Sequence, residues 1–167
     1  ASNGVLDGPG DVSGFAVNKV TGALTAVPGS PFTAGQGTFS VAVDPTGHYL
    51  YATNFDSNDI TAYAINAATG ALSAVAGSPF ADGGPGRELP GPTGLAVLPS
   101  GKFACVAHYY AYDISVLAID AATGTLADIA GSPFATEYGS YGLTIDPTGR
   151  FVYVADYGND SGSAYAV

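Results

Sequence analysis

Apolar residues in this chain occur in short runs of four to seven residues, each bounded by Gly, Pro, Asn or Asp. Apolar and polar positions tend to alternate within the runs, which is the pattern of a strand with one buried face. No segment sustains the period of an amphipathic helix. The pattern therefore predicts an all-β fold of many short strands. One set of four consecutive runs is Ser40–Val43, His48–Asn54, Ile60–Ile65 and Ala71–Val75.

Three short motifs recur in the same order: Thr-Gly, Gly-Ser-Pro-Phe and the turn Asp-Pro-Thr-Gly. They begin at Thr21, Thr69 and Thr123, at Gly29, Gly77 and Gly131, and at Asp44 and Asp146, with Leu98–Gly101 as a degenerate copy of the turn. The first two motifs have spacings of 48 and 54 residues. The chain is therefore a repeat of about 48 residues, and its middle copy carries six extra residues between Phe80 and Leu98.

Each repeat contains four strand-like runs, and four antiparallel strands in about 40–50 residues are typical of a β-propeller blade. The third run appears four times, and its first and last copies lie near the two ends of the chain. The sequence therefore predicts an all-β β-propeller segment of four-stranded antiparallel blades, with about three and a quarter blades present. The expected division is a partial blade in residues 1–32, blades in 33–80 and 81–134, and a partial blade in 135–167.

We interpret the Gly-Ser-Pro-Phe motif as structural. Pro has no N–H for a strand ladder, so it is expected to end the outer strand of each blade. Ser can hydrogen-bond to the local backbone. Phe32, Phe80 and Phe134 are expected to pack between neighbouring blades.

The segment SVAVDPTGHYLYATN, followed by ITAYAINAATGALSAVAGSPF, resembles the lactonase-type propeller repeats of the YVTN family. The resemblance covers essentially the entire chain and implies the fold of a seven-bladed propeller. It leaves the activity open. The family includes phosphogluconolactonase-like enzymes and many secreted proteins of no known activity, and a fold does not by itself specify a function.

Composition narrows the possible partners. The net charge is −10, with 14 acidic residues against four Lys and Arg, so a phosphate backbone would be repelled and no nucleic-acid partner is expected. No apolar run approaches the roughly 20 residues of a membrane span. Scarce Lys and abundant Gly, Ser, Thr and Asn favour an extracellular or cell-surface location. Cys105 stands alone in an apolar run, which indicates an inert core thiol.

A segment of three and a quarter blades would leave unpaired strand edges at both ends, and such edges invite pairing with another chain. We expect them to be covered by missing blades of a longer chain or by other copies of this chain, joined head to tail. In either case, the residues around Phe15 and Tyr165 are expected to be buried in the intact assembly.

The connections of a propeller alternate between two rims. One rim is expected to be uniform, and the other varies between repeats, as functional loops on a regular scaffold do. On the variable rim the second strands end in a column of Asn54, His108 and Asp156, which suits a small polar or sugar ligand or acid–base chemistry. Capping of strand ends is the alternative that we favour. The inserted loop adds Arg87 and Glu88, which suit a carboxylate or sugar.

No contiguous catalytic motif is present, so no catalytic residue is assigned. Residues 56–59 and 156–162 are rich in oxygen ligands, but neither segment has the ligand spacing of a calcium-binding loop. We therefore predict neither a metal nor a cofactor.

Two functions follow from these observations. We expect a non-enzymatic secreted or surface propeller that serves as a binding or assembly module, because the composition is acidic and rich in hydroxyl groups, the catalytic inventory is thin and the blade edges are open. The alternative is a lactonase-type hydrolase acting on a sugar lactone, which would need a base, an oxyanion donor and a pocket that converge on one reacting atom.

Overall fold

The computed structural model describes residues 9–82, 91–137, 139–157 and 161–166. These residues form strands and no α-helix. The strands are β1 (Pro9–Val12), β2 (Phe15–Val17), β3 (Leu24–Ala26), β4 (Phe32–Gln36), β5 (Thr38–Val43), β6 (Tyr49–Asn54), β7 (Asp59–Ile65), β8 (Leu72–Ala74), β9 (Phe80–Ala81), β10 (Pro92–Val97), β11 (Phe103–His108), β12 (Asp113–Ile119), β13 (Leu126–Asp128), β14 (Phe134–Ala135), β15 (Ser140–Ile145), β16 (Phe151–Asp156) and β17 (Ser161–Ala166).

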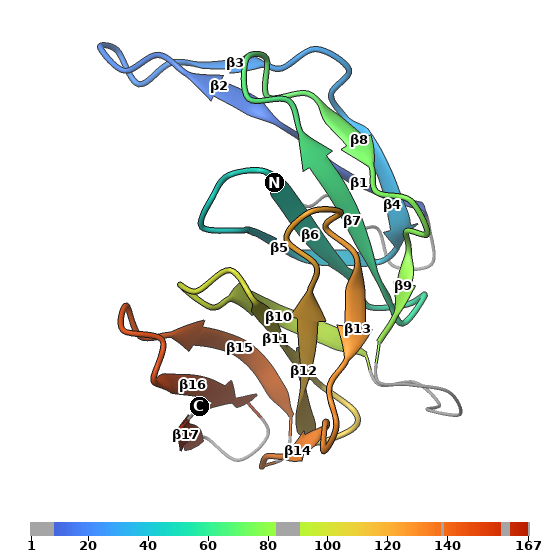
Figure 1. The fold of residues 1–167 in the computed structure, drawn as a ribbon, viewed down its shortest axis with the longest axis vertical. Coiled ribbons are helices and arrows are strands. Elements are labelled where there is room, and N and C mark those ends of the chain that lie inside the picture. Colours follow the sequence, from blue (N-terminus) through green and yellow to red (C-terminus); the bar gives the residue numbers. More distant parts are fainter. Residues whose placement is uncertain (1–8, 83–90, 138, 158–160, 167) are drawn as a thin grey trace.

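Sequential strands pair in antiparallel sheets. The order is β5-β6-β7-β8 in one sheet, β10-β11-β12-β13 in the next and β15-β16-β17 in the last. Figure 1 shows these sheets arranged as a fan, in which neighbouring strands β5, β10 and β15 follow one another and β8 and β13 lie further out. The predicted all-β, partial β-propeller fold is confirmed.

The first blade is represented by its outer half. Strand β2 pairs with β3, and β1 pairs with β4, so both the third and the fourth strand of this blade are interrupted. Val12 of β1 lies opposite Phe32 of β4, just as Ile60 lies opposite Phe80 in the following blade. The repeat seen in the sequence is therefore a repeat of strand register.

The core lies between the sheets. One cluster joins Tyr51 and Ile60 of one blade to Val106 and Leu117 of the next, and Phe80 packs against it. Inner strands approach closely at Gly94, where an added Cβ would lie 2.8 Å from the backbone nitrogen of Leu143. Each blade thus stabilises its neighbour through apolar burial, as expected of stacked repeats.

The Gly-Ser-Pro-Phe motif interrupts the outer strand of a blade; it does not end it. After the motif, β9 returns to pair with β7, and β14 with β12, so the outer strand continues. The Ser hydroxyl fills the gap by accepting a hydrogen bond from a backbone N–H of the third strand. The donors are Gly14 to Ser30 (3.1 Å), Ala62 to Ser78 (2.9 Å) and Val116 to Ser132 (2.9 Å). The expected strand end was therefore wrong, because a side-chain oxygen replaces a ladder carbonyl.

Tyrosine hydroxyls also tie one blade to another. Tyr51 donates to the carbonyl of Gly124 at 3.1 Å, and Tyr63 donates to the carbonyl of Thr33 at 2.5 Å. Burial raises the pKa of Tyr63 to about 12, so this phenol remains a donor at neutral pH. Within the described residues, no helix has the length and apolar character required to cross a bilayer.

Candidate functional site

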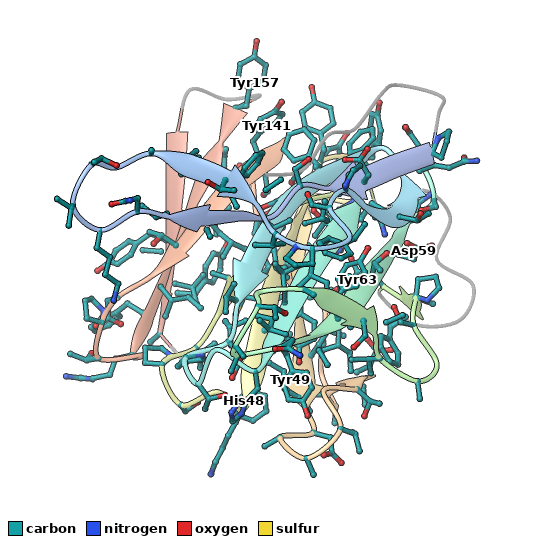
Figure 2. All side chains as sticks on the ribbon, turned by 90° about the horizontal axis from the view of Figure 1, so that it is seen from above. His48, Tyr49, Asp59, Tyr63, Tyr141 and Tyr157 are labelled. Atoms are coloured by element: carbon teal, nitrogen blue, oxygen red, sulfur yellow. The ribbon has the colours of Figure 1, made fainter. Side chains whose placement is uncertain are left out.

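The two ends of the strands form two different rims. Figure 2 shows Tyr141 and Tyr157 at one end of the molecule and His48 and Tyr49 at the other. We call the end with His48 the turn rim; it comprises the tight turns at residues 18–22, 44–47, 66–70, 98–101, 120–124 and 146–149. We call the end with Tyr141 the loop rim; its described part includes residues 33–37, 55–58, 109–112 and 136–137.

Local hydrogen bonds determine the turn rim. The Asp146 carboxylate accepts bonds from the backbone N–H groups of Thr148 (3.0 Å), Arg150 (2.7 Å) and Phe151 (2.7 Å), and from the Thr148 hydroxyl. The Thr148 hydroxyl is the main reason that the pKa of Asp146 falls to about 2. At Asp44, burial acts to raise the pKa, but the hydrogen bonds from Thr46 and from nearby backbone groups outweigh it.

On the loop rim, one backbone bond recurs in three blades. A glycine just before the inner strand accepts from the N–H of the aromatic residue just after the second strand. The pairs are Gly37 with Phe55 (2.9 Å), Gly91 with Tyr109 (3.0 Å) and Gly139 with Tyr157 (2.9 Å). The glycines have φ values of 65°, 61° and 76°, which favour a residue without a Cβ. This bond fixes an aromatic residue at the same place in each blade.

The polar column from the sequence analysis lies beneath this surface. Asn54, His108 and Asp156 are 0%, 0% and 1% exposed, respectively. Asn54 donates to Asp59 at 2.6 Å and accepts from Thr38 at 3.0 Å. The structure places the three residues at equivalent positions of successive sheets, each within its own hydrogen-bond network.

Asp156 accepts bonds from Ser140 at 2.8 Å and from Ser163 at 2.5 Å. The Ser140 hydroxyl in turn lies 2.6 Å from that of Thr136, in the connection from the preceding blade. None of the three column residues lines the cavity described below.

His108 lies between two carboxylates. Its Nδ1 is 2.8 Å from Asp113 Oδ1, and its Nε2 contacts Asp82 Oδ2. Since a carboxylate only accepts hydrogen bonds, this arrangement is satisfied when both ring nitrogens carry a proton or when one carboxyl does. The three side chains form a polar triad under the loop rim, in which His108 and Asp82 are fully buried and Asp113 is 14% exposed. Arg87 and Glu88, also named from the sequence, lie outside the described residues.

Aromatic rings cover the loop rim above this column. Phe39, Phe55, Tyr109 and Tyr141 form a closed cycle of ring contacts. The centroid distances around the cycle are 6.3 Å from Phe39 to Phe55, 6.5 Å from Phe55 to Tyr109, 6.1 Å from Tyr109 to Tyr141 and 5.1 Å from Tyr141 back to Phe39. The edge-to-face geometry of two of these contacts is favourable. Three blades contribute to this aromatic cycle.

A cavity of about 350 Å³ opens at the aromatic cycle. Its wall includes all four rings, together with Thr38 and Asp56. Such a volume suits a ligand the size of a single sugar ring, and an apolar wall with few polar groups is typical of small-molecule sites. The cavity is therefore the candidate functional site.

Asp56 is the charged group in the described wall of this cavity. Its Oδ2 is buried and has no hydrogen-bond partner among the described residues. An unpaired buried carboxylate oxygen is rare in native structures and requires an explanation; Asp82 Oδ1 is a second such atom among the described residues, but it lies outside the cavity. The residue belongs to the segment that the sequence analysis considered for calcium. Within the described part of the chain, no group of three or more potential metal-ligating His, Cys, Asp or Glu side chains is found.

Cys105 does not belong to the site. It is 1% exposed in the cluster between two blades, and burial raises the pKa of its thiol to about 11. A protonated thiol in the core is a poor nucleophile.

Comparison with protein families identifies the relatives of this architecture. The family model described as "Lactonase, 7-bladed beta-propeller" matches residues 7–167. The chain belongs to this lactonase family. The resemblance noted in the repeat motifs is thereby confirmed.

Solved structures agree with the fold of the lactonase family. A proposed 6-phosphogluconolactonase from Bacteroides uniformis superposes with a TM-score of 0.79 at 16% identity, covering 93% of this chain and 44% of that protein. A periplasmic gluconolactonase from Pseudomonas aeruginosa gives 0.74 at 20% identity, covering 95% and 44%. Hydrazine synthase from Kuenenia stuttgartiensis gives 0.73 at 13% identity, covering 99% and 54%.

These identities establish a shared fold and no more. The chain spans about half of the length of the solved proteins that it matches. A search of curated proteins gives no match.

The expectation of a non-enzymatic binding or assembly module is wrong, since the chain is a member of the lactonase family. That expectation relied in part on a thin catalytic inventory, with no contiguous catalytic motif in the sequence. A site on a propeller rim is assembled from loops of several blades, so its residues lie far apart in the sequence. The absence of a short motif therefore carries little weight for this fold.

The sequence did contain a signal for the cavity. Phe55, Tyr109 and Tyr157 directly follow the polar column and repeat in the same register. The inner-strand rings Phe39 and Tyr141 had no recognisable motif, because the equivalent residue of the middle blade is the buried Thr93.

Proposed function

We propose that the protein hydrolyses a sugar lactone bound in the loop-rim cavity. Membership of the lactonase family over residues 7–167 is the observation that carries the proposal. The cavity supports it, because an aromatic wall of this size accommodates the apolar face of a sugar ring.

In the proposed reaction, a water molecule attacks the lactone carbonyl carbon and the ring carbon–oxygen bond breaks. The attacking water loses a proton, the ring oxygen gains one, and the product is a hydroxy acid. The aromatic cycle would position the sugar ring and exclude bulk water. Its four rings come from three blades, so the fold holds them in place without a contribution from substrate.

The test is to supply the purified protein with gluconolactone and follow acid release against the spontaneous rate. Replacing Tyr141 by Leu keeps an apolar side chain but removes the ring. We expect kcat/KM to fall about three- to tenfold, which corresponds to the 0.5–1.5 kcal/mol that an aromatic contact adds. Tyr153→Leu is the matched control, since Tyr153 is similarly exposed on β16 and does not line the cavity. A rate equal to the spontaneous one across sugar lactones would refute the proposal.

A further inference from the structure

Asp56 stands out among the described acidic residues near the cavity. Elsewhere on the loop rim the carboxylates have partners in the protein: Asp59 accepts from Asn54, Asp113 contacts His108, and Asp156 accepts from two hydroxyls. Asp56 Oδ2 is buried with no partner among the described residues, as is Asp82 Oδ1, but the other oxygen of Asp82 contacts His108 and Asp82 does not line the cavity. Burial of an unpaired polar atom costs free energy, and a fold retains such an atom only where neighbouring contacts hold the residue in place.

The connection before β5 enforces that position. Asp56 N–H donates to the Gln36 carbonyl at 3.2 Å, next to the recurrent bond between Phe55 and Gly37. Gly37 makes room for the carboxylate, because a Cβ added there would lie 2.3 Å from Asp56 Oδ2. The main chain on both sides therefore encloses Asp56 Oδ2 without donating a hydrogen bond to it.

The residue that follows the recurrent bond differs between the blades. The recurrent bond places Tyr109 and Tyr157 as it places Phe55. The residue that follows is Asp56 in one blade, Tyr110 in the next and Gly158 in the last. The recurrent backbone bond occurs in all three blades, so it does not explain why one blade has a carboxylate at the next position. The acidic side chain is specific to the cavity.

The described charges around the cavity are negative. Among the described residues, the Lys and Arg side chains lie on the turn rim, at Lys19, Lys102 and Arg150. The described loop rim carries Asp56, Glu137 and the partnered carboxylates, and the whole chain has a net charge of −10. A phosphate monoester carries about −1.5 to −2 at pH 7 and would be repelled here.

We propose that the cavity selects an unphosphorylated sugar lactone and that Asp56 is the specificity-determining residue that accepts hydrogen bonds from its hydroxyl groups. This inference rests on the proposed lactone hydrolysis. Aromatic rings contact the carbon–hydrogen face of the sugar, and the carboxylate replaces the water that its hydroxyls lose on binding. Hydrogen bonds to a charged acceptor are the stronger kind, so one such residue is sufficient to set a preference.

The first test compares gluconolactone with 6-phosphogluconolactone as substrates of the unaltered protein. We expect kcat/KM to be at least about tenfold higher for the unphosphorylated lactone. In Asp56→Asn, kcat/KM for gluconolactone should fall about tenfold or more, mainly through KM, while the phosphorylated substrate is affected less. Asp128→Asn removes the same charge from an exposed position on β13 and should leave both values unchanged. Equal or better use of the phosphorylated lactone would overturn this inference and leave the proposed function standing.

A binding measurement separates the two proposals further. The probe is 1,5-anhydroglucitol, a neutral sugar ring that has no carbonyl to hydrolyse, measured by titration calorimetry with the unaltered protein and Asp56→Asn. Binding that weakens about tenfold in the variant supports the inference even if no lactone is turned over. Binding of tetramethylammonium in place of the sugar would overturn it, because rings with a carboxylate can also enclose an organic cation. If neither 1,5-anhydroglucitol nor tetramethylammonium binds, the inference is overturned as well.

Discussion

The turn rim and the loop rim are built from the same repeat, yet different interactions specify them. On the turn rim, Asn18, Asn66 and Asp120 each accept two backbone N–H groups from two and three residues ahead. On the loop rim, His108 contacts Asp82 from 26 residues away, and Tyr141 contacts Phe39 two repeats away. The turn rim is therefore encoded locally and repeats, whereas the loop rim depends on assembly and varies.

Variation on the turn rim confirms how local it is. Leu98 replaces the aspartate of the middle turn, but the backbone bonds remain: Gly101 N–H to Leu98 at 2.8 Å, against Gly47 N–H to Asp44 at 3.0 Å. A glycine with positive φ closes each of these turns, at 74°, 69° and 70°. A single loop-rim substitution, by contrast, changes a network that spans two blades.

The largest effect is expected at the polar triad. Replacing His108 by Ala removes the partner of the fully buried Asp82 carboxyl, and removal of one partner of a buried charge pair costs about 3–5 kcal/mol. His108→Asn should cost less, since Asn54 already makes the equivalent bond to Asp59 in the preceding blade. Urea unfolding gives the free energies.

His48, the other histidine, is exposed on the turn rim and provides the control. His48→Ala should change stability by no more than about 0.5 kcal/mol. A His108→Ala protein as stable as His48→Ala would show that the triad does not contribute to the stability of the loop rim.

A smaller effect is expected at two glycines of the turn rim that share their local structure. Gly22 and Gly124 have φ values of 73° and 75°, so Ala at either position costs about 1–2 kcal/mol in the left-handed region. A Cβ at Gly22 would meet nothing within 4 Å, whereas at Gly124 it would lie 2.3 Å from the Tyr49 ring. Gly124→Ala should therefore lose about 1–3 kcal/mol more than Gly22→Ala.

Unfolding of the two variants in the same buffer measures this difference directly. Equal losses of stability in the two variants would mean that Tyr49 moves aside without cost. The contact between the two blades at Gly124 would then not constrain the turn rim. In a Tyr49→Ala background, which itself loses the bond to Ala122, Gly124→Ala should cost only about as much as Gly22→Ala if the clash is the cause.

The smallest effect is a pH dependence at Asp146. Its pKa lies near 2 in the folded protein, against an ordinary value of 3.8, chiefly because Thr148 donates to the carboxylate. A lowered folded pKa stabilises the protein above about pH 4, and this contribution is lost as the pH falls from about 4 to about 2. Thr148→Val should raise the pKa of Asp146 toward its ordinary value, followed by NMR titration of the carboxyl carbon. An unchanged pKa would assign the shift to backbone donors alone.

Much of the fold was predictable because its determinants are local. The turns at Asp44 and Asp146, the glycines that close them and the alternating strands between them recur with a period short enough to read by inspection. The role of Gly-Ser-Pro-Phe was less accessible. A Pro predicts the loss of a ladder bond, but only the structure shows Ser78 Oγ accepting from Ala62 in place of a carbonyl and the strand resuming at β9.

The amino-acid sequence alone determined the all-β repeat, the blade pattern and the resemblance to lactonase propellers, since each follows from residues within one repeat. Only the tertiary structure decided which side of the loop rim is open. The polar column was visible in the sequence, but connections from the preceding blade cover Asn54 and His108. The cover over Asn54 is close, since a Cβ added at Gly35 would lie 2.6 Å from the Asn54 side-chain nitrogen. The aromatic cycle and Asp56 are left facing the cavity, because burial is a property of neighbouring blades and not of any one strand.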